Sequence, residues 1–146
     1  MSIPKDPDPA KLVISLFTPD KTMVRTVLER IEALTSPVDL ISAWIDFDFT
    51  EYYEQEMGRP LYRRLAAFTG LIHQQDLARI KTETNRIENA FLENGKRTVN
   101  IDPGYLLPSR FILATGKEYS HRVYIGQNIY ADLTLIYHKK GFKTLE

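Results

Sequence analysis

The order in which strand-like and helix-like segments alternate constrains this fold more than any single motif. Residues 12–17 form a continuous apolar run of strand length, which is typical of a central strand covered on both faces. From Met23 to Leu34, apolar residues recur every three or four positions. This spacing predicts a helix with Thr18 as its N-cap and Ser36–Pro37 as its end.

Residues 40–49 alternate between two sets of side chains, as a β-strand does. One set is expected to pack against the helices, and it comprises Ile41, Ala43, Ile45, Phe47 and Phe49. Trp44, Asp46 and Asp48 would then share the opposite face of the strand. Two carboxylates beside a tryptophan make that face a candidate site.

Two further helices and two strands are expected in the middle of the chain. Residues 50–58 predict a short helix, and residues 63–71 predict a strand, although a helix would also fit their spacing. The longest helix is expected over residues 74–94 and ends at Asn94–Gly95. A short buried strand through Ile101 follows it.

A turn and three more strands are expected in the remaining sequence. Asp102-Pro103-Gly104 has the composition of a tight turn, because proline presets φ and glycine accepts positive φ. Residues 110–115 predict a strand. Residues 120–125 and 128–137 predict a hairpin that turns at Gly126–Gln127.

Apart from the short helix at residues 50–58, the order is strand, helix, strand, strand, helix and strand. This order predicts an α+β fold with a ferredoxin-like βαββαβ core. The later strands predict a C-terminal antiparallel β-extension. We expect a single α+β domain over residues 11–146, preceded by a polar, proline-rich leader at residues 1–10.

The predicted topology would bring polar residues to one end of the sheet. The carboxyl ends of segments 40–49 and 98–101 are expected to emerge there, and the start of the third strand would lie beside them. The two outer strands would be about 14 Å apart, at roughly 4.8 Å per strand spacing. A gap of that width would cradle a small ligand between side chains that include Asp48, Asp102, Arg63 and Arg64.

Composition disfavours several classes of function. Basic and acidic side chains number 19 each, so no overall field attracts nucleic acid or an anionic membrane. The chain has no cysteine, which excludes disulfides and thiolate catalysis. No apolar run approaches the roughly 18 residues that a membrane helix needs. We therefore expect a cytoplasmic protein that binds no membrane, with nucleic acid disfavoured.

Carboxylates that could carry chemistry lie in two places. Asp46 and Asp48 stand two residues apart and could share a hard cation such as Mg²⁺, although a plain polar strand face is the favoured explanation. Asp102 and Tyr105 could supply acid–base groups at a cleft, beside Asn100 on a buried strand. A turn alone would also explain Asp102.

The best cationic cluster comprises Lys117, His121 and Arg122. Such a cluster could meet a phosphate or carboxylate, and histidine is the side chain most easily poised for proton transfer near neutral pH. A charged entry to the predicted hairpin is the alternative explanation. Arg59, Arg63 and Arg64 form a second, smaller basic cluster.

The string Asn100-Ile101-Asp102-Pro103-Gly104-Tyr105 is the most specific stretch of the chain. Together with several other stretches, it resembles the prokaryotic family catalogued as domain of unknown function 4416. The resemblance covers nearly the whole chain, and it implies no established activity. The other matching stretches are 46–50, Tyr52–Tyr53, 56–58, 113–115 with Lys117, His121–Arg122, 129–131 and Thr134–Leu135.

Together these features predict a domain that binds a small anionic or phosphate-bearing ligand, with a reaction on that ligand left open. Catalytic roles are expected for Asp46, Asp48, Asp102, Tyr105 and His121. Ligand contacts are expected from Asn100, Lys117, Arg122, Arg63 and Arg64. The alternative is a non-catalytic interaction or oligomerisation module that uses exposed strands and tyrosines. RNA binding through Arg59–Arg64 is the third candidate.

Overall fold

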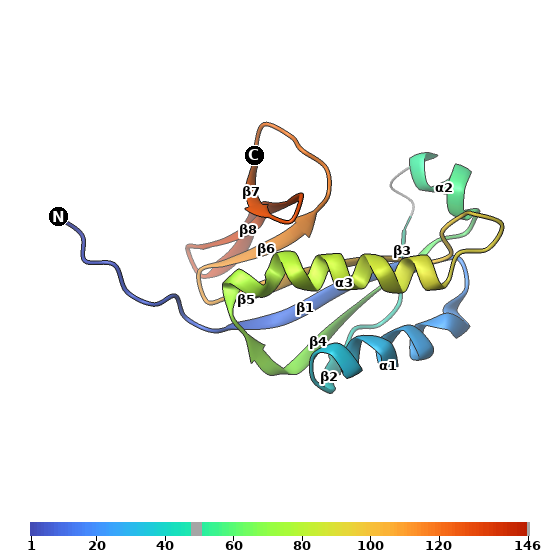
Figure 1. The fold of residues 1–146 in the computed structure, drawn as a ribbon, viewed down its shortest axis with the longest axis horizontal. Coiled ribbons are helices and arrows are strands. Elements are labelled where there is room, and N and C mark those ends of the chain that lie inside the picture. Colours follow the sequence, from blue (N-terminus) through green and yellow to red (C-terminus); the bar gives the residue numbers. More distant parts are fainter. Residues whose placement is uncertain (48–50, 146) are drawn as a thin grey trace.

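One antiparallel β-sheet carries the fold, and two helices cover one of its faces (Figure 1). The computed structural model describes residues 1–47 and 51–145. Within these residues the sheet has nine strands, in the order β2-β4-β1-β5-β6-β8-β7, with β3 paired to β4 and β9 paired to β8. None of the helices in the described part of the chain is both long enough and apolar enough to span a bilayer.

The elements have the following bounds. The strands are β1 (Ala10–Thr18), β2 (Val38–Ile41), β3 (Ile45–Asp46), β4 (Tyr62–Ile72), β5 (Asn100–Leu107), β6 (Arg110–Thr115), β7 (Arg122–Gly126), β8 (Ile129–His138) and β9 (Gly141–Thr144). The helices are α1 (Val24–Leu34), α2 (Glu51–Met57) and α3 (Leu77–Ala90), with short 3-10 turns at Lys21–Met23 and Gln74–Asp76.

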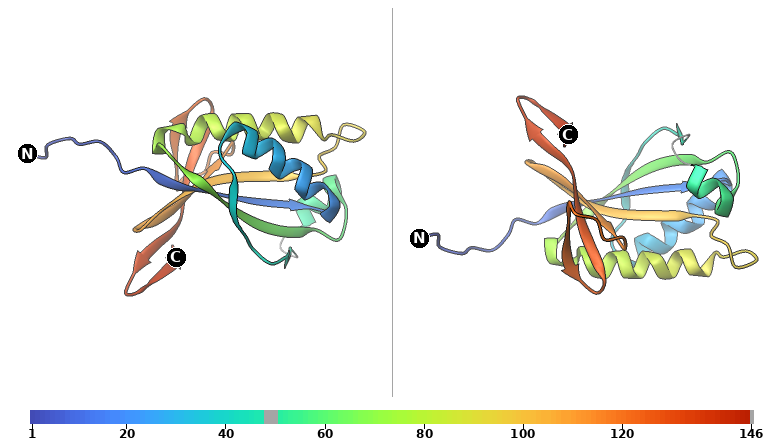
Figure 2. Two further views of the ribbon diagram at one scale, coloured as in Figure 1. Left: turned by 90° about the horizontal axis from the view of Figure 1, so that it is seen from below. Right: turned by 90° about the horizontal axis from the view of Figure 1, so that it is seen from above.

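The main core lies between the sheet and helices α1 and α3. Alternate residues of β1, including Leu12 and Ile14, are fully buried against these helices. Their partners include Ile31 of α1 and Ile80 of α3, and each fully buried side chain of this kind contributes about 1.5–3 kcal/mol. Both views in Figure 2 place α1 and α3 on the same side of the sheet. The strand and helix patterns of residues 12–34 are thereby confirmed.

The prediction of a ferredoxin-like core with a separate β-extension is wrong. The strands after β5 continue the same sheet, because β6 pairs with β5 and β8 pairs with β6. The predicted strand directions are also wrong, since β2 runs opposite to β5. Local spacing identifies a strand, but only the partner at each edge decides where a sheet ends.

Residues 40–49 do not form the single strand that their alternation predicts. The pairing with β4 is interrupted at Ser42, whose hydroxyl accepts the N–H of Leu65 at 2.9 Å in place of a backbone carbonyl. Trp44 packs against the core under the helices, on the opposite side to the one expected. Phe47 instead joins a second cluster with Phe17, on the other face of β1. The other predicted residues of this segment, Asp48 and Phe49, lie outside the described residues.

The predicted turn at Asp102-Pro103-Gly104 is also wrong, because all three residues belong to the continuous strand β5. Gly104 is required for close approach to β6, since a Cβ there would lie 2.4 Å from the carbonyl oxygen of Ile112. Pro103 precedes the first residue of β5 that pairs with β6. A residue without a backbone N–H is tolerated at such an unpaired edge.

Element ends differ from the predictions in smaller ways. Asp20 caps the 3-10 turn Lys21–Met23 that leads into α1, and its carboxylate accepts the N–H of Thr22 at 2.9 Å. Thr18, the predicted N-cap, instead donates to the carbonyl of Thr98 at 2.7 Å. Helix α3 ends at Ala90, four residues before the predicted stop. The β7–β8 turn is shifted by one residue, and strand β9 was not predicted. The strands expected near residues 63–71 and 110–115 are confirmed.

Candidate functional site

The open edge of β5 is the starting point of the candidate site. Strand β6 pairs with β5 only from Gly104 onward, so residues 100–103 of β5 pair with β1 alone in the described structure. Helix α3 completes this edge through two side chains. Glu88 accepts the N–H of Ile101 at 2.7 Å, and Lys81 donates to the carbonyl of Ile101 at 2.8 Å.

Lys81 and Glu88 are both buried, with side-chain exposures of 8% and 7%. Burial raises the pKa of Glu88, although the charges of Lys81 and Arg97 oppose that shift. An isolated buried charge would cost several kcal/mol, and two ion pairs reduce that cost here. Lys81 lies 3.2 Å from a carboxylate oxygen of Asp102, and Glu88 lies 3.7 Å from the guanidinium of Arg97.

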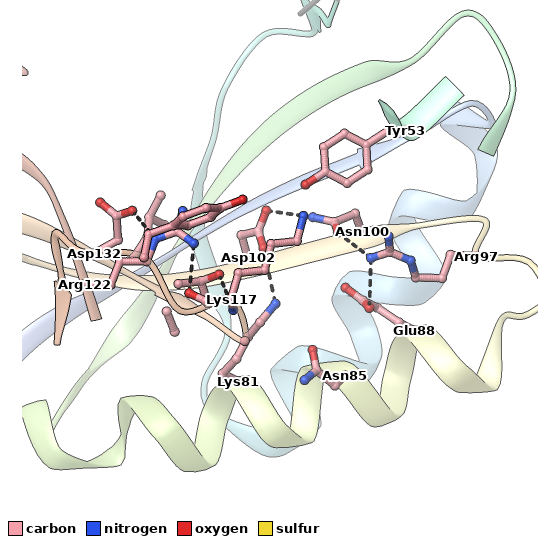
Figure 3. Close-up of a pocket in the computed structure, with 15 residues that line it drawn as sticks. Tyr53, Lys81, Asn85, Glu88, Arg97, Asn100, Asp102, Lys117, Arg122 and Asp132 are labelled. Atoms are coloured by element: carbon pink, nitrogen blue, oxygen red, sulfur yellow. Dashed lines mark hydrogen bonds and ion pairs between the residues drawn. The ribbon is translucent and has the colours of Figure 1, made fainter. Parts of the chain in front are cut away.

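A chain of hydrogen bonds runs from α2 across β5 to α3. Arg97 binds both carboxylate oxygens of Glu56, at 2.9 and 2.8 Å, and donates to Asn100 at 2.8 Å. Asn100 in turn donates to Asp102 at 2.7 Å, and Asp102 meets Lys81 (Figure 3). Arg97 lowers the pKa of Glu56, and Glu56 raises the pKa of Arg97. The chain fixes the rotamers of these side chains.

The segment between β6 and β7 borders the other side of the site. Arg122 binds Asp132 of β8 at 2.9 Å and donates to the carbonyl of Lys117 at 2.9 Å. Its guanidinium lies 4.5 Å from the centre of the Tyr119 ring. His121 lies 3.4 Å from the same carboxylate of Asp132. Arg122 and Asp132 therefore hold the loop that carries Lys117.

Lys117 differs from the other cations of the site in its partners. Its ammonium lies 4.4 Å from the ring centre of Tyr52 and 5.6 Å from that of Tyr53. No carboxylate oxygen of the described residues lies within 4 Å of it. The aromatic rings attract the cation without neutralising its charge.

These side chains surround a cavity of about 460 Å³, bordered by α3 on one side and Tyr53 on the other (Figure 3). Four cations and three carboxylates line it, with amides, tyrosines and a threonine between them. The lining residues are Tyr53, Lys81, Asn85, Glu88, Arg97, Asn100, Asp102, Leu113, Ala114, Thr115, Gly116, Lys117, Tyr119, Arg122 and Asp132.

Four of the residues singled out from the sequence line this cavity: Asn100, Asp102, Lys117 and Arg122. His121 contacts the lining residue Asp132 but does not itself line the cavity.

The remaining candidates lie elsewhere. Tyr105 packs on the helix-covered face with Ile112. Asp46 is exposed on β3, Arg63 lies over Phe47, and Arg64 lies over Trp44. Asp48 lies outside the described residues. Within the described residues, no three His, Asp or Glu side chains are grouped as metal ligands would be. The described residues thus supply no further ligand for the Mg²⁺ ion predicted at Asp46 and Asp48.

Sequence reasoning missed the contribution of α3 and of Arg97 to the site. Glu88 is buried although its side chain is charged. A signal was present, because Lys81, Thr84 and Glu88 follow one another at three- and four-residue spacing. They lie beside the apolar positions Ile80 and Ile87, where charged side chains need a partner.

A comparison with family models decides the relationship of this chain to known proteins. The model described as Domain of unknown function (DUF4416) matches residues 8–146. The chain belongs to the DUF4416 family. This confirms the resemblance carried by residues 100–105, which form most of β5 and its open edge. No curated protein and no solved structure matches the chain significantly.

Proposed function

We propose that this DUF4416 protein binds a small anionic ligand, such as a phosphate ester or a polycarboxylate, in the cavity beside the open edge of β5. The observation that carries the proposal is the position of Lys117. Its ammonium borders a 460 Å³ cavity and has no carboxylate partner within 4 Å among the described residues. A cation in that situation favours an anionic ligand.

The other charges of the cavity are already engaged. Asp102 accepts from Asn100 and Lys81, Asp132 accepts from Arg122, and Glu88 accepts from Ile101. These carboxylates therefore repel a ligand anion less than unpaired ones would. They also hold the donors in fixed positions, which lowers the entropy cost of binding.

The lining also suggests what the rest of the ligand contains. Asn85, Thr115 and Tyr119 supply neutral hydrogen-bonding groups, and Leu113 and Ala114 supply a small apolar surface. A ligand with at least one anionic group and further hydroxyl or amide groups would satisfy both sets. This composition disfavours a purely apolar ligand.

Binding can be tested by calorimetry with inorganic phosphate, pyrophosphate, a nucleoside monophosphate and citrate, using neutral ribose for comparison. We expect at least one anion to bind and ribose to bind much more weakly. Replacing Lys117 by glutamine should weaken anion binding about 10- to 100-fold, which corresponds to roughly 1.5–3 kcal/mol for a charged hydrogen bond.

The variant Arg86→Gln is the matched control, because Arg86 is an exposed cation on α3 that does not line the cavity. It should bind as the unmodified protein does. If Lys117→Gln and Arg86→Gln lost anion affinity equally, the loss would come from the overall charge of the protein and not from a site at Lys117. Absence of heat with all four anions would contradict the proposal.

Self-association is the second candidate function, and the two edge strands of the sheet, β2 and β7, support it. Leu40 of β2 and Val123 and Tyr124 of β7 are well exposed on the outermost strands of the sheet. Unpaired edges with apolar side chains favour pairing between copies. Light scattering after size exclusion should then give a dimer or larger. A monomer at high concentration would count against it.

RNA binding through Arg59–Arg64 has less support, because these arginines have partners within the chain. Arg59 pairs with Glu54, Arg63 stacks on Phe47, and Arg64 donates to the carbonyl of Ser42 at 2.9 Å. The cytoplasmic location stays a prediction from composition.

A further inference from the structure

The hairpin between β8 and β9 has an unusual turn. Its two loop residues, Lys139 and Lys140, both have positive φ, at 46° and 70°. A two-residue loop with positive φ at both positions is a type I′ turn, for which Asn-Gly is strongly preferred. The left-handed conformation costs a residue such as lysine about 1–2 kcal/mol. Two lysines at these positions therefore reduce local stability, and a gain in stability does not explain their presence in the turn.

The hairpin tip, defined here as residues 137–144, is strongly basic. It contains Lys139, Lys140 and Lys143 and no acidic residue, although the whole chain has no net charge. All three lysines are exposed. None has a carboxylate oxygen within 4 Å in the described part of the chain. The tip thus concentrates positive charge that nothing in the described structure neutralises.

Two aromatic rings lie one residue pair before the ends of the strands that the Lys139–Lys140 turn joins. Tyr137 and Phe142 are cross-strand partners, with ring centres 5.4 Å apart in a T-shaped arrangement. Their exposures are 50% and 43%. Both views of Figure 2 show this hairpin projecting from the sheet on the side away from α1 and α3. The rings and the lysines are therefore accessible to a large partner.

We propose that the hairpin tip binds single-stranded nucleic acid, with Lys139 and Lys140 on the phosphate backbone and unpaired bases against Tyr137 and Phe142. Single-strand binding combines basic side chains that follow the backbone with aromatic rings on which bases stack. A membrane fits less well. Apolar side chains would have to lead into the bilayer, whereas here the two charges of Lys139 and Lys140 lie at the very end.

This site shares no residue with the cavity lined by Lys117. The two proposals therefore fail separately. The phosphate backbone is common to RNA and DNA, so both strands are used as probes. Fluorescence anisotropy of the full chain with labelled oligo(U) and oligo(dT) of about 20 nucleotides, at about 50 mM and about 200 mM salt, measures the affinity and its salt dependence.

The informative variant is Lys139→Asn with Lys140→Gly. It removes two charges and supplies the preferred residues of a type I′ turn, so the hairpin should fold at least as well. We expect about 10-fold weaker binding at the lower salt concentration. The slope of log affinity against log salt should also become smaller by about 1.4, at roughly 0.7 per lost phosphate contact.

The double variant Arg86→Gln with Lys96→Gln is the control, because it removes the same charge from exposed positions outside the tip. It should bind nearly as the unmodified protein does. Replacing Tyr137 by serine should weaken binding while leaving the salt slope unchanged, since stacking involves no ion release.

Unchanged affinity in Lys139→Asn with Lys140→Gly, an equal loss in the control, or no binding to either strand would overturn the proposal. If the protein floats with anionic vesicles but binds no oligonucleotide, the tip binds a membrane surface and the proposal is wrong. If duplex DNA bound as tightly as the single strands, base stacking on Tyr137 and Phe142 would play no part in binding.

Discussion

Glu88 on α3 accepts the backbone N–H of Ile101 on β5 at 2.7 Å, at a position where a neighbouring strand would normally supply the acceptor. Lys81 satisfies the carbonyl of the same residue. A helix thus completes the hydrogen bonding of a sheet edge with two charged side chains. Because β6 separates from β5 at this point, the edge borders a cavity.

Replacing Glu88 by leucine should destabilise the protein by about 3 kcal/mol or more. The change leaves the N–H of Ile101 without its acceptor and removes a negative charge beside Lys81 and Arg97. Urea unfolding followed by circular dichroism measures this change. Glu93→Leu is the control, since Glu93 is exposed and that substitution should change stability by less than about 0.5 kcal/mol.

Acid should weaken the connection between α2 and β5. Arg97 holds the pKa of Glu56 below its usual value of 4.5, so the carboxylate stabilises the fold above pH 4.5. That contribution is lost as the pH falls through the lowered pKa. Glu56→Gln should therefore be less stable than the unmodified protein at neutral pH, and the difference should shrink below pH 4.5. Unfolding midpoints between about pH 3 and about pH 7 test this, and a difference that does not change with pH would contradict it.

Gly104 should not tolerate alanine. Its added Cβ would lie 2.4 Å from the carbonyl oxygen of Ile112 and 2.9 Å from Leu113. Since backbone cannot yield easily, β5 and β6 would have to separate, at a cost of about 1–3 kcal/mol or more. Thermal unfolding of Gly104→Ala measures the loss. Gly116→Ala provides the comparison, because nothing lies within 4 Å of its Cβ position, and it should unfold at nearly the same temperature as the unmodified protein.

Phe17→Ala should cost about 3–5 kcal/mol and loosen α2. Phe17 is buried, stacks on Phe47 at 4.6 Å and meets Tyr53 of α2 edge-on at 4.8 Å. Hydrogen exchange should accelerate in α2 more than in α1, because α1 packs on the opposite face of β1. Leu40→Ala removes an exposed side chain and should change stability by less than about 0.5 kcal/mol.

Much of the secondary structure was predictable because its signals are local. The spacing from Met23 to Leu34 identifies α1, and the apolar run at residues 12–17 identifies β1. The same logic failed at residues 102–104, where turn-forming residue types occur inside a strand. There glycine and proline serve the contact with β6 and an unpaired edge, and both of these features depend on segments distant in sequence.

Of the candidate site, the sequence by itself determined the polar residues of β5 and the cationic loop, Asn100, Asp102, Lys117 and Arg122, since their residue types limit the chemistry available. Only the tertiary structure decided that they meet, and that Lys81, Glu88 and Arg97 join them. The physical reason is the edge of β5. Where β6 turns away from β5, the unpaired backbone groups of β5 require hydrogen-bond partners. The charged side chains of α3 fill that role, and no local pattern along β5 predicts them.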